Sequence, residues 1–89
     1  IAFPDITPVA PIHILVIPKV AIRDISCISQ LTPAEAAGFL NGIAKTADVC
    51  GLVAGGFRTV MNTGVEGGQT VPYLHAHILG GRQLSWPPG

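Results

Sequence analysis

Apolar and branched residues concentrate in three stretches of the chain that we expect to be strands. They span residues 12–18, 57–62 and 71–79, and a shorter apolar stretch opens the chain at residues 1–3. Alternation in the first stretch places Ile12, Ile14 and Val16 on one face and His13, Leu15 and Ile17 on the other. Both faces are largely apolar, so we expect this strand to be covered on both sides.

The last stretch carries two of the three histidines of the chain, His75 and His77. In a strand they share one face, about 7 Å apart, while the apolar residues between and around them face a core. The glycine-rich loop 63–70 joins this stretch to residues 57–62. Two strands joined in this way pair antiparallel.

A helix is predicted from Pro33 onward. Thr32 is the expected N-cap, Pro33 fits the first helical position and Glu35 completes a capping box. Gly51 is the expected C-terminal stop. Apolar residues recur at helical spacing between these ends: Ala36, Phe39, Leu40, Ile43, Ala44, Ala47 and Cys50.

The order strand, strand, helix, strand, strand predicts one α+β domain over residues 1–89. An antiparallel sheet carries the helix on one face, and we expect His13, His75 and His77 on the other. A proline-stiffened connector, residues 4–11, cannot be helical. Because the chain starts at Ile1 inside an apolar stretch, we expect further residues upstream of it.

Composition narrows the classes of partner. The chain is 48% apolar and 11% charged, against about 25% charged in a typical domain, and we expect its apolar surface to be covered in a homodimer. Five basic and five acidic residues give no net charge and no cluster for nucleic acid. No apolar run reaches the ~20 residues of a membrane span, and no signal peptide is visible, so we expect a cytoplasmic protein without membrane contact.

The residues alone leave two chemical interpretations of the histidine strand open. In one, His13, His75 and His77 bind zinc and leave a fourth position free for water. In the other, His75 is a nucleophile, and amides of the glycine-rich loop hold an anionic phosphate.

Several segments resemble the histidine triad (HIT) superfamily, and within it the histidine-triad nucleotide-binding protein branch. The resemblance covers essentially the whole chain. It is carried by Phe3-Pro4-Asp5-Ile6, Ala10-Pro11-Ile12-His13-Ile14-Leu15-Val16-Ile17-Pro18-Lys19, Asn62, Gly67-Gly68-Gln69-Thr70, Leu74-His75-Ala76-His77, and Gly80-Gly81-Arg82 through Trp86-Pro87-Pro88-Gly89.

The resemblance implies a HIT-like fold and a homodimeric enzyme that binds purine nucleotides. Such an enzyme hydrolyses nucleoside phosphoramidates or acyl-nucleotides to the nucleoside monophosphate, without metal or other cofactor. It implies that His75 is the nucleophile, that His77 and Thr70 serve the leaving group, and that His13 supports the nucleophile. The implied nucleotide contacts are Phe3, Ile6 and Leu15 around the base, Asp5 at the ribose, and Asn62, Gly68, Gln69 and Thr70 at the phosphate. Trp86 matches a tail residue that approaches the partner subunit's site.

One position departs from the family pattern. Tyr73 stands where the first histidine of the triad is expected. If the backbone carbonyl at this position orients the central histidine, any residue serves and activity survives. If the imidazole is needed in a hydrogen-bond network with His13, a phenol substitutes only partly. We expect a working but slower enzyme, with a nucleotide-binding or scaffolding protein of little turnover as the alternative.

Overall fold

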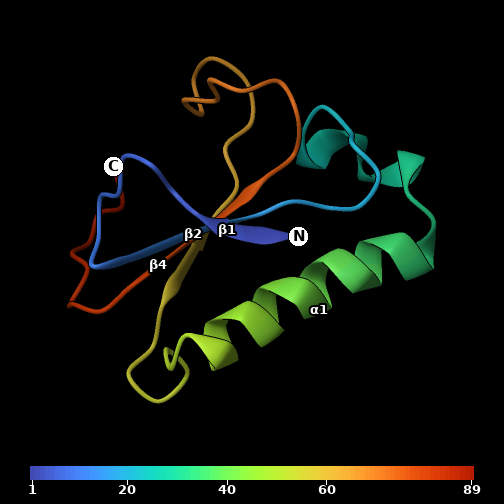
Figure 1. The fold of residues 1–89 in the computed structure, drawn as a ribbon. Helices are drawn as coiled ribbons and strands as arrows, with labels where there is room; N and C mark the ends of the chain where they lie inside the picture. Colours follow the sequence, from blue (N-terminus) through green and yellow to red (C-terminus); the bar gives the residue numbers. More distant parts are fainter.

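The computed structural model describes residues 1–89 and confirms the α+β prediction (Figure 1). Its elements are β1 (Ala2–Pro4), β2 (Ile12–Val16), the 3-10 helix η1 (Ile25–Gln30), α1 (Pro33–Val49), β3 (Arg58–Val60) and β4 (Ala76–Gly80). The strands form one sheet in the order β1-β2-β4-β3, and every neighbouring pair is antiparallel. The two longest strands, β2 and β4, therefore lie at its centre.

The helix covers one face of this sheet (Figure 1). Buried side chains of the two central strands, including Val16 and Ile78, meet Phe39, Ile43 and Ala47 of α1 in the core. These helical residues recur every fourth position and so form one stripe. Burial of a large aliphatic or aromatic side chain contributes about 1.5–3 kcal/mol. Packing against α1 thus fixes which face of β4 is apolar and leaves the opposite face for chemistry.

Local signals set the ends of the helix as predicted. The Glu35 N–H donates to Thr32 Oγ1 over 3.1 Å, and the Thr32 N–H donates to Glu35 Oε1 over 2.8 Å, which completes the capping box. The helix ends at Val49, and Gly51 follows the C-cap with a φ of 71°. The predicted apolar stripe was too wide, because Leu40 is 57% exposed and Ala44 is exposed as well.

The strand predicted over residues 71–79 is shorter than expected, since β4 begins only at Ala76. Pro72 has no N–H to donate to a neighbouring strand. The Tyr73 N–H bends back to Val71 O, and the Leu74 N–H donates to Ile22 O outside the sheet. His75 therefore lies just before β4, whereas His77 lies within it.

Two other elements differ from the prediction. Strand β3 covers only the centre of the predicted stretch 57–62. The 3-10 helix η1 was not predicted; its N-cap is Asp24, whose carboxylate accepts from the Ser26 N–H over 2.8 Å.

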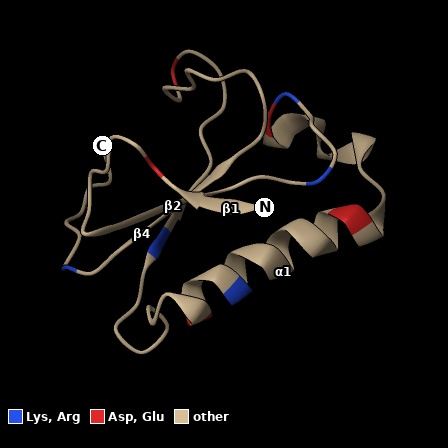
Figure 2. Cartoon of the chain, in the orientation of Figure 1, with Lys and Arg blue, Asp and Glu red and all other residues tan.

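Charged residues are sparse and scattered over the chain, apart from the neighbouring pair Arg23 and Asp24 (Figure 2). The Lys and Arg residues do not form a cluster. None of the helices has the length and apolar character needed to span a lipid bilayer.

Candidate active site

The three histidines gather on the sheet face away from α1, as predicted. Their rings form a row: the centroids of His13 and His77 lie 5.1 Å apart, and those of His77 and His75 lie 5.0 Å apart. The sheet register produces this row, because Leu15, two residues after His13, pairs with His77 in the neighbouring strand. Residues from opposite ends of the chain thus meet at one place.

A backbone carbonyl holds the His75 ring. The Nδ1 atom lies 2.8 Å from the main-chain oxygen of Tyr73. A carbonyl oxygen only accepts, so Nδ1 carries the hydrogen in this contact. In the neutral ring Nε2 is then unprotonated and carries the free lone pair. The Tyr73 phenol ring packs edge-on to the imidazole at 5.8 Å and is 37% exposed.

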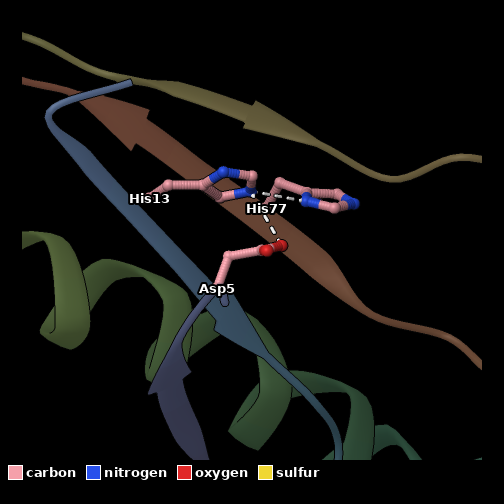
Figure 3. A group of neighbouring side chains, drawn as sticks. All are labelled: Asp5, His13 and His77. Carbon is pink, nitrogen blue, oxygen red and sulfur yellow. Dashed lines mark hydrogen bonds and ion pairs between the residues drawn. The ribbon is translucent and has the colours of Figure 1, made fainter. Parts of the chain in front are cut away.

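His13 is buried and has a contact at each ring nitrogen. The Val9 N–H donates to its Nδ1 over 3.1 Å. Its Nε2 lies 2.9 Å from His77 Nδ1 and 3.4 Å from Asp5 Oδ2 (Figure 3). Since Nδ1 accepts a hydrogen bond, the neutral ring carries its hydrogen on Nε2. The resemblance implied that His13 supports His75, but the structure bonds it to His77.

His77 is half-buried, and its surroundings disfavour the protonated ring. Burial is the largest cause that lowers the pKa of His77 below its usual 6.5. The neighbouring His75 and His13 rings lower this pKa further, while the Asp5 carboxylate opposes them. Because Nδ1 accepts from His13, the neutral His77 ring carries its hydrogen on Nε2.

Asp5 lies beside this row. Its Oδ1 accepts from the Thr7 N–H over 2.7 Å, and its main-chain N–H donates to His13 O over 3.0 Å. The carboxylate is thus fixed to the end of β1 and to β2. Sequence reasoning expected Asp5 at the ribose and did not foresee its contact with His13.

Asp5, His13 and His77 are also the residues that could hold a metal ion, with one donor atom of each within 4.8 Å of the others. His75, which the zinc interpretation required, is not in this group. A histidine ligand binds a metal through an unprotonated nitrogen. The Val9 contact leaves the hydrogen of His13 on Nε2, the atom that faces the other two residues. The group is therefore arranged for hydrogen bonding rather than for a metal ion.

Several hydrogen-bond donors and acceptors of the glycine-rich loop are paired within the loop itself. The amide hydrogens of Gly68 and Gln69, expected to face a phosphate, are donated to Val65 O and Gly64 O. The Gln69 side chain accepts from the Gly64 N–H and donates to Arg23 O and Val71 O, at 2.8–3.0 Å. The Gln69 side chain thus anchors the loop, which leaves Thr70 as its exposed polar residue next to the anchor.

The other residues named from the sequence differ in exposure. Leu15 and Asn62 are half-buried. Phe3 is 39% exposed and Ile6 is 99% exposed, so Ile6 forms no wall within this chain. Trp86 is 80% exposed, and the Arg58 guanidinium lies 6.0 Å from its ring centre.

The backbone N–H of Val9, which contacts His13, was not predicted as part of the site, because no side-chain pattern marks it.

Known proteins resemble this chain over its whole length. Residues 1–84 match the HIT domain. The chain belongs to the HIT domain family. A HIT-like protein of Synechococcus elongatus is 48% identical over 89 residues, which cover all of this chain and 77% of the relative.

Solved HIT structures share the fold. A HIT family hydrolase from Legionella pneumophila superposes with a TM-score of 0.86 at 43% identity, over 99% of this chain and 79% of the other. A histidine triad protein from Clostridium difficile superposes with a TM-score of 0.81 at 40% identity, over 94% of this chain and 73% of the other.

Proposed function

We propose that this HIT protein belongs to the nucleotide-binding branch and cleaves purine nucleoside phosphoramidates or acyl-nucleotides to the nucleoside monophosphate. The observation that carries the proposal is the contact between His75 Nδ1 and the Tyr73 carbonyl. It holds the ring and leaves Nε2 as a free lone pair, which is what a nucleophile requires. The similarity to a HIT family hydrolase supports a hydrolytic role.

The reaction proceeds in two displacements. His75 Nε2 attacks the α-phosphorus, a P–N bond forms, and the bond from phosphorus to the leaving amine or carboxylate breaks. Water then attacks the same phosphorus, breaks the P–N bond and releases the nucleoside monophosphate with the neutral histidine, while one proton of the water passes to solvent. Splitting one displacement into two lowers the barrier to each.

His77 acts on the leaving group. Its Nε2–H and the Thr70 hydroxyl donate hydrogen bonds to the bridging atom as negative charge develops there. A neutral imidazole that lost this hydrogen would become an anion, so His77 stabilises the leaving group while keeping its proton. A carboxylate leaves without protonation, and an amine takes its proton from solvent.

The remaining contacts are with the nucleotide. The Asp5 carboxylate accepts from the ribose hydroxyls, since an ionised carboxylate only accepts. Leu15 and Phe3, on the histidine face, contact the base, and Asn62 with the Thr70 amide contacts the phosphate. Ile6 is 99% exposed in the single chain. It contacts the base only once bound nucleotide or a second protomer covers it.

We also propose a homodimer. The edge strand β3 and the 57%-exposed Leu40 of α1 leave backbone donors and apolar surface uncovered in one chain. In the dimer the exposed Trp86 approaches the partner's site.

The test is to trap the intermediate. After rapid mixing with an adenosine phosphoramidate and acid-free quenching, mass spectrometry should find one adenylyl group on the peptide that contains His75. The same experiment on His77→Ala, which keeps the nucleophile, controls for nonspecific labelling of a histidine. Adenylylation elsewhere would disprove the assignment. Binding of adenosine monophosphate by calorimetry without any turnover would favour the scaffolding alternative.

A further inference from the structure

We propose that the backbone N–H of Val9 sets the hydrogen-bond direction of the histidine row, and that His13 transmits it as a positioning residue to His77. This inference rests on the proposed function only for the use made of His77. Val9 lies in the connector between β1 and β2, four residues before His13, and contributes no side-chain atom to the contact.

Two neutral imidazoles in contact allow two arrangements: either His13 Nε2–H donates to His77 Nδ1, or His77 Nδ1–H donates to His13 Nε2. The second requires the His13 hydrogen on Nδ1, where it would point at the Val9 N–H. A donor facing a donor in a buried place is costly. Only the first arrangement satisfies both the contact from Val9 to His13 and the contact between His13 and His77.

The direction then determines what His77 presents. With Nδ1 accepting from His13 over 2.9 Å, its own hydrogen stays on Nε2, the nitrogen not used within the row. That nitrogen is the donor which the leaving group needs. In the opposite arrangement Nε2 would present a lone pair and repel the developing negative charge.

Asp5 favours the same direction. Its Oδ2 lies 3.4 Å from His13 Nε2, and a carboxylate there attracts an N–H and repels a lone pair. The contact to His77 Nδ1 is shorter, at 2.9 Å, so the hydrogen is shared mainly with His77 and secondarily with Asp5.

The connector holds Val9 from two directions. Pro8 and Pro11 restrict the backbone on either side of it. Arg82, which follows β4, donates from Nη2 to Val9 O over 3.2 Å. The amide that faces His13 is therefore carried by a stiff segment that is tied to the end of the neighbouring strand β4.

The direct experiment is a two-bond ¹H–¹⁵N correlation spectrum of the native protein without ligand. We expect His13 and His77 as Nε2–H tautomers, with His13 Nδ1 unprotonated, and His75 as the Nδ1–H tautomer. A protonated His13 Nδ1 would overturn the inference. The spectrum requires no substrate, so it is independent of whether the proposed activity exists.

A variant pair tests the origin of the effect. Val9→Pro removes the N–H. We expect the fraction of His77 in the Nδ1–H form to rise at least about tenfold, from an undetectable level to that of a measurable minor form. Ala10→Pro is the matched control, because it adds a proline to the same connector where no hydrogen bond is lost. If the tautomer ratio stays the same in Val9→Pro, or changes equally in Ala10→Pro, Val9 does not set the direction.

The role of His13 has its own test. His13→Leu removes the donor to His77, and we expect kcat to fall about tenfold with little change in KM. His13→Gln retains an N–H donor and should recover part of that loss. Equal losses in the two variants would show that His13 serves packing alone. If the trapping experiment finds no adenylyl group on His75 in the native protein, the proposed function is contradicted. The tautomer result is unaffected by that outcome.

Discussion

The two histidines near β4 are two residues apart in sequence but are held in opposite ways. His75 is oriented by a main-chain atom of Tyr73, two residues earlier. His77 is oriented by the side chain of His13, which lies 64 residues away in sequence and in another strand. One ring depends on local backbone geometry, and the other depends on the whole sheet.

This difference bears on Tyr73, which the family resemblance places where the first triad histidine is expected. A backbone carbonyl is present whatever the side chain, so the contact to His75 does not depend on which residue stands at position 73. The Tyr73 phenol has no hydrogen-bond partner within the chain and meets His75 only edge-on. One of the two alternatives from the sequence gave the imidazole at this position a place in a hydrogen-bond network with His13. In this chain His13 contacts His77 and Asp5 instead.

The largest expected effect is at the locally held ring. His75→Ala removes the nucleophile, and we expect kcat/KM for an adenosine phosphoramidate to fall at least about 10³-fold, because direct attack by water lacks the covalent step. Steady-state fluorescence or chromatography of the released amine measures it. Near-normal turnover would show that another group attacks.

A smaller loss is expected at the ring held across the sheet. His77→Ala removes one hydrogen bond to the leaving group, and we expect kcat to fall about 10²-fold. The loss should be larger for an amine leaving group than for a carboxylate, because the amine is the poorer leaving group. Equal losses for the two substrates would place His77 away from the bridging atom.

Of His75, His77 and Tyr73, Tyr73 should have the smallest effect on kcat. In Tyr73→Phe and Tyr73→Ala the backbone carbonyl remains, so we expect kcat within about threefold of the native value. Tyr73→His introduces the residue that the family resemblance implies at this position and should raise kcat by no more than about tenfold. A greater gain would mean that the missing imidazole is needed and that the His13 network does not replace it.

The pKa of His77 gives a measurement without turnover. Burial keeps it below 6.5, so its ¹H NMR titration midpoint should lie below that value. His75→Ala should raise this pKa toward 6.5, and Asp5→Asn should lower it further. Because the unfolded chain takes up this proton more readily, the contribution of His77 to stability falls as the pH drops below 6.5. A lower pKa of His77 in His75→Ala, or a higher one in Asp5→Asn, would contradict the arrangement of charges.

No change is expected on removal of metal. Dialysis against EDTA should leave kcat/KM within error, since the hydrogen on His13 Nε2 faces the place where an ion would bind. Added Zn²⁺ after dialysis should not raise it. Activity that disappears with chelator and returns with zinc would restore the zinc interpretation and would require His13 to change tautomer.

Prediction from sequence succeeded where the controlling contacts are local. The capping box from Thr32 to Glu35 and the stop at Gly51 fixed the ends of α1, because each contact spans only a few residues. Alternation placed His75 and His77 on one face. The start of β4 was misjudged, because the Leu74 amide pairs with Ile22, a contact that no local pattern reveals.

The site shows the same limit. Its residue types were foreseen, but the connections between them were not. The bond from His13 to His77 depends on the register of β2 with β4, and the role of Gln69 depends on the position of Arg23 O. The amide of Val9 has no signature in the sequence, since every residue except proline carries one.

The Gln69 side chain has a consequence for engineering. By accepting from the Gly64 N–H and donating to Arg23 O and Val71 O, it fastens both ends of the glycine-rich loop. The tip between them, with Val65 96% exposed, contributes nothing to the core. Exposed tips on anchored loops accept insertions well. Residues 65 and 66 therefore offer a place to graft a peptide tag or a reporter, provided that Gln69 is kept.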